Sequence, residues 1–476
     1  MNRLILIIQC CFVAILFACE HQPNASSHQE VDAIFSRWHT ADANTPGCAL
    51  AVIHQGEIIY SKGYGMADIE HNVPITPQSI FYIGSVSKQF VATALLLLEE
   101  EGKLSLEDDI RKYIPELPDY GHTIRLHHLI HHTSGLRDNL TLWEMSGRSM
   151  IDDIPEEEIF ELICRQQGLN FIPGEDYAYS NTCYYLMSIV IERVSGHSLR
   201  DFAQENIFTP LGMKHSQFND DNQRIIPQRA FGYTQLAEDS IGNLIMRFDL
   251  VGSGGLYSSV EDLYLWDQNF YHNQLGKRGQ ALIDQLQTNG RYNNGEEVDY
   301  AYAMINGEYR GLRTIHHTGS MGGYRAVYLR FPDEEFSIII LGNVDNLNPL
   351  VRAYEVASVY LRDKLGPEPP KPEEKANASA STKQENYEVS MHQFTGKFYS
   401  PELNAYYQLK YEPEEEKISL TDPKGNSTII RITNRNELSN STYEITFDKN
   451  FQTFNMNYAG IQGIIFNKLA NTTANE

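Results

Sequence analysis

The chain has 476 residues, 42% of them apolar, which is enough to bury a sizeable core and excludes wholesale disorder. Its formal net charge of −24 argues against nucleic acid as a partner, because phosphate binding requires clustered lysine and arginine. Net charge does not identify a substrate, so the chemistry has to be found in motifs.

Residues 1–19 are predicted to be an export signal. An apolar run from Leu4 to Ala18 is too short for a comfortable bilayer span and is typical of a signal peptide. It ends in Leu16-Phe17-Ala18-Cys19, which resembles a bacterial lipobox and predicts Cys19 as the lipidated first residue of an exported, membrane-anchored lipoprotein. An ordinary signal peptide cleaved nearby and an uncleaved anchor are the alternatives. Polar residues 20–29 are interpreted as a tether.

The domain at residues 30–365 is predicted to combine strands with a helical middle. Strand signals open and close it, and residues 105–290 are rich in helix and loop signals. One sheet built from both ends of the domain, with a helical insertion, is therefore expected, in an α+β fold. The expected elements are a hairpin at 49–53 and 58–60, a buried helix at 86–101, a helix at 182–194, strands at 326–329 and 336–341, and a closing helix at 351–364.

Two further segments follow. Residues 366–386 are rich in Pro, Glu, Lys, Ala and Ser without periodicity, which is typical of a linker. Residues 387–476 hold short alternating runs separated by Asn, Pro and Gly, which predicts an all-β module of small-barrel or sandwich type.

The lone Ser-x-x-Lys of the chain, Ser85-Val86-Ser87-Lys88, opens the predicted buried helix. One helical turn separates Ser85 from Lys88, so both side chains are expected on one face. A desolvated lysine loses proton affinity and can activate a serine nucleophile, while the helix start supplies donors for an oxyanion. The alternative is a capping serine at the start of a surface helix.

Two other stretches carry candidate site residues. Tyr179 and Asn181 stand just before the second helix, where a tyrosine can relay a proton and an amide can fix a carbonyl or a lysine. His317, Thr318, Gly319 and Ser320 follow one another later in the chain, and Gly319 permits close approach of a backbone. Taken alone, the first stretch is more often a cap at a helix start, and the second is more often a plain turn after a strand.

Together and in this order, the three motifs resemble the superfamily of serine β-lactamases and penicillin-recognising hydrolases. This superfamily carries Ser-x-x-Lys and a Lys-Thr-Gly box, and the class C enzymes, D-alanyl-D-alanine peptidases, D-aminopeptidases and related esterases are the most similar branches. The resemblance implies an antiparallel sheet flanked by helices and a cofactor-free serine hydrolase. It implies Ser85 as nucleophile, Lys88 and Tyr179 as acid/base pair, Asn181 and 317–320 as substrate contacts, and the amides of Ser85 and Ser320 as an oxyanion hole. The C-terminal module resembles the lipocalin-like β-domains of some relatives.

One departure from this pattern bears on the substrate. The third box begins with His317 instead of lysine, and an unperturbed histidine is mostly neutral near pH 7. Weaker capture of a substrate carboxylate is expected, which favours a peptidase or esterase over a dedicated β-lactamase. Lowering the pH toward 6 is expected to protonate His317 and to improve binding of carboxylated substrates.

Two alternatives remain. A protein that is acylated by cell-wall fragments, or only binds them, would be a sensor instead of an enzyme. The four histidines His127, His128, His131 and His132 have i, i+4 spacing that can indicate zinc, but no metal is expected because no H-E-x-x-H pattern accompanies them.

Overall fold

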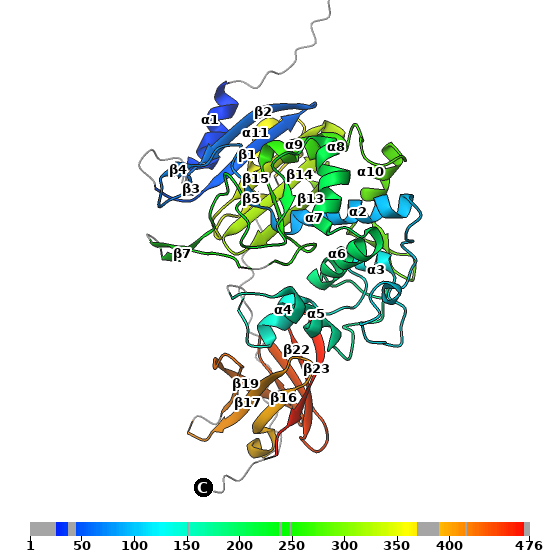
Figure 1. The fold of residues 1–476 in the computed structure, drawn as a ribbon. Coiled ribbons are helices and arrows are strands. Elements are labelled where there is room, and N and C mark those ends of the chain that lie inside the picture. Colours follow the sequence, from blue (N-terminus) through cyan, green and yellow to red (C-terminus); the bar gives the residue numbers. More distant parts are fainter. Residues whose placement is uncertain are drawn as a thin grey trace, which may run out of the picture.

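The computed structural model describes residues 25–36, 44–149, 152–237, 240–247, 249–368, 390–414 and 417–470. Cys19 and nearly all of the predicted linker lie outside these residues. A larger N-terminal body combines a sheet with helices, and a smaller C-terminal barrel lies at one end of it (Figure 1).

A six-stranded antiparallel sheet forms the centre of the larger body. Within the described residues its strand order is β12-β13-β14-β15-β1-β2. Strands β1 and β15 join the two ends of the domain, with Cys48 opposite Gly342 and His54 opposite Phe336. The sheet is therefore built from both ends of the domain, as predicted. The strands are β1 (Cys48–His54), β2 (Glu57–Tyr64), β12 (Ile305–Tyr309), β13 (Leu312–Met321), β14 (Tyr324–Phe331) and β15 (Phe336–Gly342).

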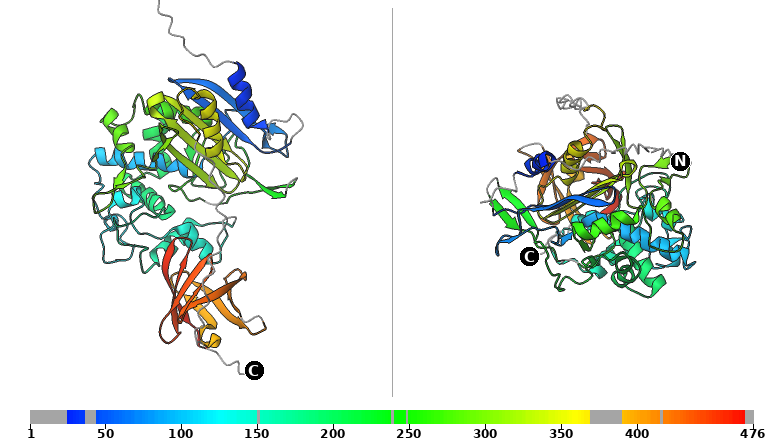
Figure 2. Two further views of the ribbon diagram at one scale, coloured as in Figure 1. Left: turned by 180° about the vertical axis from the view of Figure 1, so that it is seen from behind. Right: turned by 90° about the horizontal axis from the view of Figure 1, so that it is seen from above.

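Helices cover both faces of this sheet (Figure 2). Helices α1 (Ala25–Ile34) and α11 (Pro349–Tyr360) pack against each other on one face, where Val31, Val356 and Ile338 share a buried core. Helix α9 (Val260–Asn269) contacts β1 and β15 from the other face. Helix α1 begins inside the segment 20–29, which was predicted as a tether, because its apolar residues pack against α11 and the sheet.

The helical region begins with α2 (Lys88–Glu100), which is buried along most of its length. The sequence predicts its start at Val86, but a 3₁₀ turn over Gly84–Ser87 comes first, closed by a hydrogen bond from Ser87 Oγ to the Gly84 carbonyl. Short 3₁₀ turns are frequent at helix N-termini. The other helices are α3 (Leu126–Ile130), α4 (Asn139–Met145), α5 (Glu156–Cys164), α6 (Asn181–Ser195), α7 (Leu199–Ala203), α8 (Thr209–Leu211) and α10 (Gln280–Leu286).

Nine short strands lie in the connecting segments of the described part of this body. They pair two or three at a time outside the main sheet. They are β3 (Met66–Asp68), β4 (Val73–Pro74), β5 (Phe81–Tyr82), β6 (Gln217–Phe218), β7 (Tyr233–Ala237), β8 (Ser240–Asn243), β9 (Leu256–Ser258), β10 (Gly290–Arg291) and β11 (Glu297–Val298).

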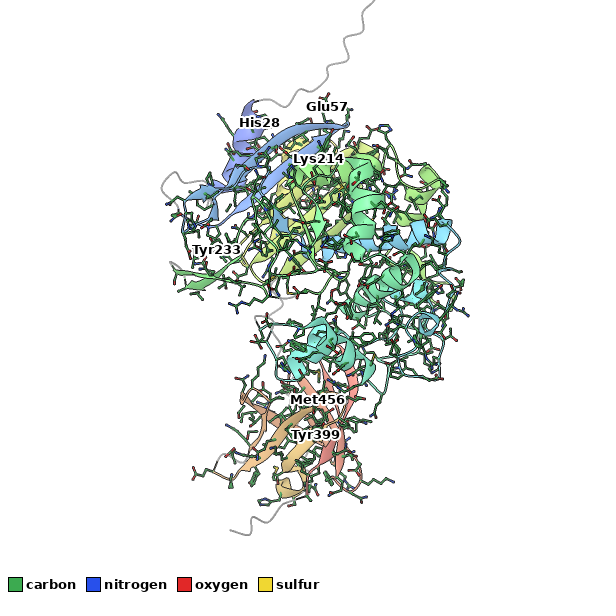
Figure 3. The ribbon with its side chains drawn as sticks, in the orientation of Figure 1. His28, Glu57, Lys214, Tyr233, Tyr399 and Met456 are labelled. Carbon is green, nitrogen blue, oxygen red and sulfur yellow. The ribbon has the colours of Figure 1, made fainter. Side chains whose placement is uncertain are left out.

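The C-terminal module is a closed antiparallel barrel, formed by eight strands among residues 390–414 and 417–470. Pairing of β16 with β23 closes it, with Phe398 opposite Lys468. Side chains alternate along each strand, and Met456 on β22 points into the barrel core (Figure 3). The strands are β16 (Gly396–Ser400), β17 (Ala405–Glu412), β18 (Lys417–Thr421), β19 (Ser427–Asn434), β20 (Glu437–Ser439), β21 (Tyr443–Phe447), β22 (Thr453–Tyr458) and β23 (Ile461–Lys468).

The predicted α+β architecture with a C-terminal small barrel is thus confirmed. A search of the described helices for an apolar stretch long enough to cross a bilayer finds none. Cys48, Cys164 and Cys183 are free thiols.

Candidate active site

Ser85 and Lys88 meet at the start of α2. Lys88 Nζ lies 2.9 Å from Ser85 Oγ. Gly84 takes a φ of +55°, and a Cβ there would lie 2.6 Å from the amide nitrogen of Ser320. Only glycine fits this position, because it tolerates the left-handed backbone and leaves room for the facing strand. The structure therefore brings the two residues of the Ser-x-x-Lys motif into direct contact, as their spacing predicted.

The Lys88 side chain is fully buried, and its Nζ has three polar partners, which in the charged form take all three of its donors. Besides Ser85, its Nζ donates to Asn181 Oδ1 at 2.9 Å and to the Ser253 carbonyl at 2.5 Å. Burial lowers the pKa of Lys88 to about 7, and the nearby carboxylate of Asp138 opposes this shift only in part. At neutral pH a large fraction of Lys88 is thus an uncharged amine, which can accept a proton from a serine hydroxyl.

Tyr179 lies on the other side of the same pair. The Lys88 Nζ is 5.0 Å from the centroid of the Tyr179 ring. Tyr179 is 38% exposed overall, but protein surrounds its hydroxyl, and this burial raises its pKa above the usual value. A hydrogen bond with Ser85 opposes the rise. Tyr179 therefore stays a neutral phenol near pH 7, which suits a proton relay and not a phenolate base.

Asp138, which the sequence analysis missed, orients Asn181. Its Oδ2 accepts from the Asn181 backbone nitrogen at 2.6 Å and from Asn181 Nδ2 at 2.9 Å. The amide group of Asn181 is thereby turned so that Oδ1 faces Lys88. The other oxygen, Oδ1, caps α4 by accepting from Thr141 N. An aspartate before the helical Asn139-Leu140-Thr141 run is a recognisable N-cap signal, but this signal reveals the helix and not the link to Asn181.

Strand β13 brings Gly319 and Ser320 against the start of α2. A Cβ on Gly319 would lie 1.9 Å from the Ile83 carbonyl oxygen and 3.1 Å from Ser85 N. The backbone nitrogens of Ser85 and Ser320 therefore both lie where the strand meets the 3₁₀ turn, and there Ser320 is exposed and Thr318 half-buried. Two neighbouring amides can hold a developing oxyanion when both point toward it.

His317 is on the same strand, but its imidazole is buried, with only 3% of the residue exposed. Its Nε2 lies 3.0 Å from the Tyr300 hydroxyl and its Nδ1 lies 2.6 Å from the Thr318 carbonyl. Burial, and then the nearby Lys88, lower its pKa to about 3. The expectation that His317 becomes charged near pH 6 is therefore wrong, because the unperturbed value does not apply in this enclosed position.

His132 is the centre of an aromatic cluster behind Tyr179. Its ring centroid lies 4.3 Å from that of Tyr179 and 4.7 Å from that of Tyr300. Its Nδ1 accepts from Ser180 N, and burial lowers its pKa well below the usual value. His132 thus fixes the backbone that presents Tyr179 and Asn181. Among the described residues, no group of three or more histidine, cysteine, aspartate or glutamate side chains is arranged to hold a metal ion.

A groove of about 490 Å³ adjoins this site and is lined partly by the barrel. Its walls come from the end of the loop before α6, from the start of α4, and from the turn between β22 and β23. It is lined by Asp138, Thr141, Asn170, Tyr177, Ala178, Tyr179, Asn181, Ala459, Gly460 and Ile461. A larger cavity of about 700 Å³, lined by residues such as Val73 and Phe231, contains none of the candidate residues.

Comparison with known proteins places this geometry in a family. A family model described as "Beta-lactamase" matches residues 31–360. Penicillin-binding protein 4* of Bacillus subtilis is 32% identical over 306 residues, covering 60% of this chain and 66% of that protein. A D-aminopeptidase of Gluconobacter oxydans is 27% identical over 300 residues, covering 63% of this chain and 56% of that protein. The matches thus span less than two thirds of these relatives.

A solved structure resembles the fold over a longer stretch. The octameric penicillin-binding protein homologue from Pyrococcus abyssi is 22% identical, with a TM-score of 0.61, and the likeness covers 93% of this chain and 99% of that one. At this coverage the likeness of fold includes the C-terminal barrel. The family model matches well over half of this chain, so the chain belongs to the β-lactamase family of serine hydrolases.

Proposed function

We propose that the protein hydrolyses its substrate by acyl transfer, with Ser85 as the residue that is acylated. The observation that carries this proposal is the 2.9 Å contact of Lys88 Nζ with Ser85 Oγ, made by a lysine whose pKa burial lowers to about 7. A base with a pKa near the working pH combines a large deprotonated fraction with enough proton affinity.

In the proposed first step, Ser85 Oγ attacks the substrate carbonyl carbon while its proton passes to Lys88 Nζ. The amides of Ser85 and Ser320 hold the oxyanion, and each such donor contributes on the order of 3 kcal/mol to transition-state stabilisation. As the carbonyl re-forms and the bond to the leaving group breaks, Tyr179 gives its proton to the leaving group and takes back the Ser85 proton from Lys88 Nζ. In the second step a water molecule attacks the acyl-enzyme, its proton returns through the same groups, and Ser85 is released.

The groove favours substrates that need no carboxylate next to the scissile bond. Among its described lining residues the one ionisable carboxylate is Asp138, and none is lysine or arginine. His317 is neutral above about pH 3 and offers no charge to a carboxylate. The relatives named D-aminopeptidase and penicillin-binding protein add support for a peptide. A D-amino-acid peptide, a cell-wall stem peptide and an ester are the three candidate classes, and a dedicated β-lactamase is disfavoured.

A cell-wall fragment sensor is the competing function. A sensor is acylated at Ser85 and then stalls, whereas an enzyme releases the acyl group. The enzyme is favoured because Lys88 and Tyr179 both lie next to Ser85, where either group would be in reach of a water molecule that attacks the acyl group. Deacylation rates measured after a single acylation, for one member of each substrate class, separate the two functions.

Active-site labelling tests the nucleophile. The protein is treated with a fluorophosphonate or penicillin probe, and the adduct is located by mass spectrometry. The adduct is expected on Ser85 and is lost in Ser85→Ala. Ser87→Ala is the matched control, because the Ser87 hydroxyl donates to the Gly84 carbonyl and should not be labelled. An adduct on any other serine contradicts the proposal.

We also propose that the protein is exported and held at a membrane by lipid on Cys19, with Glu20 as the second residue of the mature chain. The lipobox-like Leu16-Phe17-Ala18-Cys19 at the end of a short apolar run supports this. Detergent partitioning of wild type and Cys19→Ala after export tests it. The variant should move to the aqueous phase, and equal membrane retention of both proteins contradicts lipidation.

A further inference from the structure

The turn between β22 and β23 forms the wall of the groove that faces Tyr179 and Asn181. Ala459, Gly460 and Ile461 line this wall and come from the barrel, far along the chain from the site. Figure 1 shows β22 and β23 directly beneath α4, and the view from behind in Figure 2 agrees. The barrel thus contributes surface to the site of the catalytic domain.

A buried ion pair fixes the barrel in this place. Arg137 Nη1 donates to Glu402 Oε2 at 2.9 Å, and both side chains are at most 3% exposed. Arg137 Nη2 donates to the Gln462 carbonyl at 2.7 Å, next to the groove-lining Ile461. Breaking a buried pair by removing one partner leaves an uncompensated charge, so this contact specifies one docking geometry strongly.

Two further hydrogen bonds reinforce the same contact. Gln462 N donates to Asn170 Oδ1 at 2.9 Å, and Gln167 N donates to Glu402 Oε1 at 3.1 Å. Asn170 itself lines the groove, so one residue joins the wall of the helical region to the wall of the barrel.

The docking contact and the site share one stretch of backbone. Arg137 immediately precedes Asp138, which holds Asn181. The Arg137 carbonyl also accepts from Thr182 Oγ1 at 2.6 Å, so it is bonded to the first turn of α6. A displacement of the barrel therefore bears directly on the groups that place Asn181 beside Lys88.

The turn that forms the wall is short and well defined. Tyr458 pairs with Ile461, which leaves a two-residue loop in which Ala459 and Gly460 have φ of +46° and +86°. Two residues with positive φ are what a tight hairpin requires. Ile461 is 1% exposed and anchors the end of the turn in the barrel core.

We propose that this turn is a specificity-determining wall, which limits the size of the substrate group accepted beside Tyr179 and Asn181. This inference rests on the proposed acyl transfer at Ser85 and narrows the class of substrate that this reaction would use. The groove of about 490 Å³ lies within the range of ~300–1,000 Å³ usual for small-ligand sites. It suits a compact neutral or amino-bearing peptide or ester group, and the barrel blocks a bulky polymer from this side.

Substitution at Ala459 tests the wall. Asn tolerates positive φ, so Ala459→Asn narrows the groove without disturbing the turn. Gly425→Asn is the matched control, because Gly425 takes a φ of +87° in another barrel turn and a Cβ there would meet no atom within 4 Å. Two series of esters are compared by kcat/KM, one with growing acyl groups and one with growing alcohols, each starting from a small acetate ester.

In one of the two series, Ala459→Asn should lower kcat/KM for the largest member about 10-fold, the scale of a steric misfit in a pocket. Ala459→Asn should affect the acetate ester less than the largest member of that series, and Gly425→Asn should match wild type on every ester. The same size dependence in wild type and Ala459→Asn across both series overturns the proposal. Turnover of the acetate ester by Ser85→Ala at the wild-type rate overturns the proposed function instead.

Glu402→Gln provides a second measurement. It keeps the shape of Glu402 but removes its charge, so the docking contact weakens. Amide hydrogen exchange should quicken in residues 458–463, and discrimination between large and small esters should fall, while the probe still labels Ser85. Unchanged discrimination together with quickened exchange shows that the barrel position does not set substrate size, and this outcome also overturns the proposal.

Discussion

Lys88 and His317 are two buried basic groups on opposite sides of the candidate site, and burial affects them differently. Lys88, at the start of α2, begins from a high pKa that burial lowers to about 7. His317, on β13, begins near 6.5, and burial lowers its pKa to about 3. The same physical cause thus makes the lysine a usable base and leaves the histidine a neutral hydrogen-bonding group above about pH 3.

Their contacts agree with this division. Lys88 Nζ contacts Ser85, the proposed nucleophile, and Asn181, which lines the groove. His317 instead contacts the Tyr300 hydroxyl and the Thr318 carbonyl, which hold the strand and the aromatic cluster in place. In the proposed mechanism, proton transfer therefore falls to Lys88 on the helix side, while His317 holds the strand side in place.

The largest effect is expected from removing the base. Lys88→Met keeps much of the buried volume but cannot accept the Ser85 proton, so acylation should slow roughly 10²–10⁴-fold, the usual contribution of a general base. Single-turnover acylation by an activated ester measures this directly. Lys103→Met, on an exposed lysine, is the control. An acylation rate within a few-fold of wild type contradicts the role of Lys88.

The same lysine should make stability depend on pH. Its folded pKa is about 7 and its unfolded value is 10.5, so between these values the unfolded state binds more protons and stability rises with pH. The full difference amounts to roughly 5 kcal/mol. Below pH 7 this contribution has no slope.

The measurement is the free energy of unfolding in urea at several pH values from 6 to 10, for wild type and Lys88→Met. Subtracting the two series removes the contribution of tyrosine and cysteine residues. The difference should be flat from pH 6 to about 7 and then change steadily up to pH 10. A constant difference over the whole range contradicts the lowered pKa.

Asp138→Asn should have the next largest effect, on the order of 3 kcal/mol of stability, because two charge-assisted hydrogen bonds to Asn181 are weakened. The carboxylate also raises the pKa of Lys88, so its removal should move the acid side of the kcat/KM profile to lower pH. Asp119→Asn, on an exposed carboxylate, is the control. A loss of stability without a change in the pH profile would make Asp138 a structural residue only.

Asp138 also shows where sequence reasoning ends. Ser85 and Lys88 could be predicted, because one helical turn fixes their relation whatever the rest of the chain does. The strands at 326–329 and 336–341 could be predicted equally well, because short, mostly apolar runs with β-branched and aromatic residues favour a buried strand. The link of Asp138 to Asn181 depends on how α4 packs beside α6, and no local pattern encodes it.

The burial of individual side chains could not be predicted from the sequence either. The pKa of about 3 for His317 depends on its burial and then on the nearby Lys88, and both follow from the tertiary fold. The contact of Arg137 with Glu402 joins residues far apart in the chain and could be recognised only once both were placed. The barrel was predicted as a module, but its share in the groove was not.

The smallest effect is expected at His317, and it sharpens the comparison most. His317 is neutral at both pH 5 and pH 6. It should therefore cause no change between these pH values in the ratio of kcat/KM for a carboxylated substrate to kcat/KM for a neutral one. His317→Lys adds a group able to carry charge and should shift this ratio toward the carboxylated substrate by about 1–3 kcal/mol, the range for a charge-assisted hydrogen bond. His317→Gln, which adds no charge, is the matched control. An unchanged ratio in a folded, active His317→Lys means that this position does not read the carboxylate, and the argument against β-lactamase activity would then rest on the groove alone.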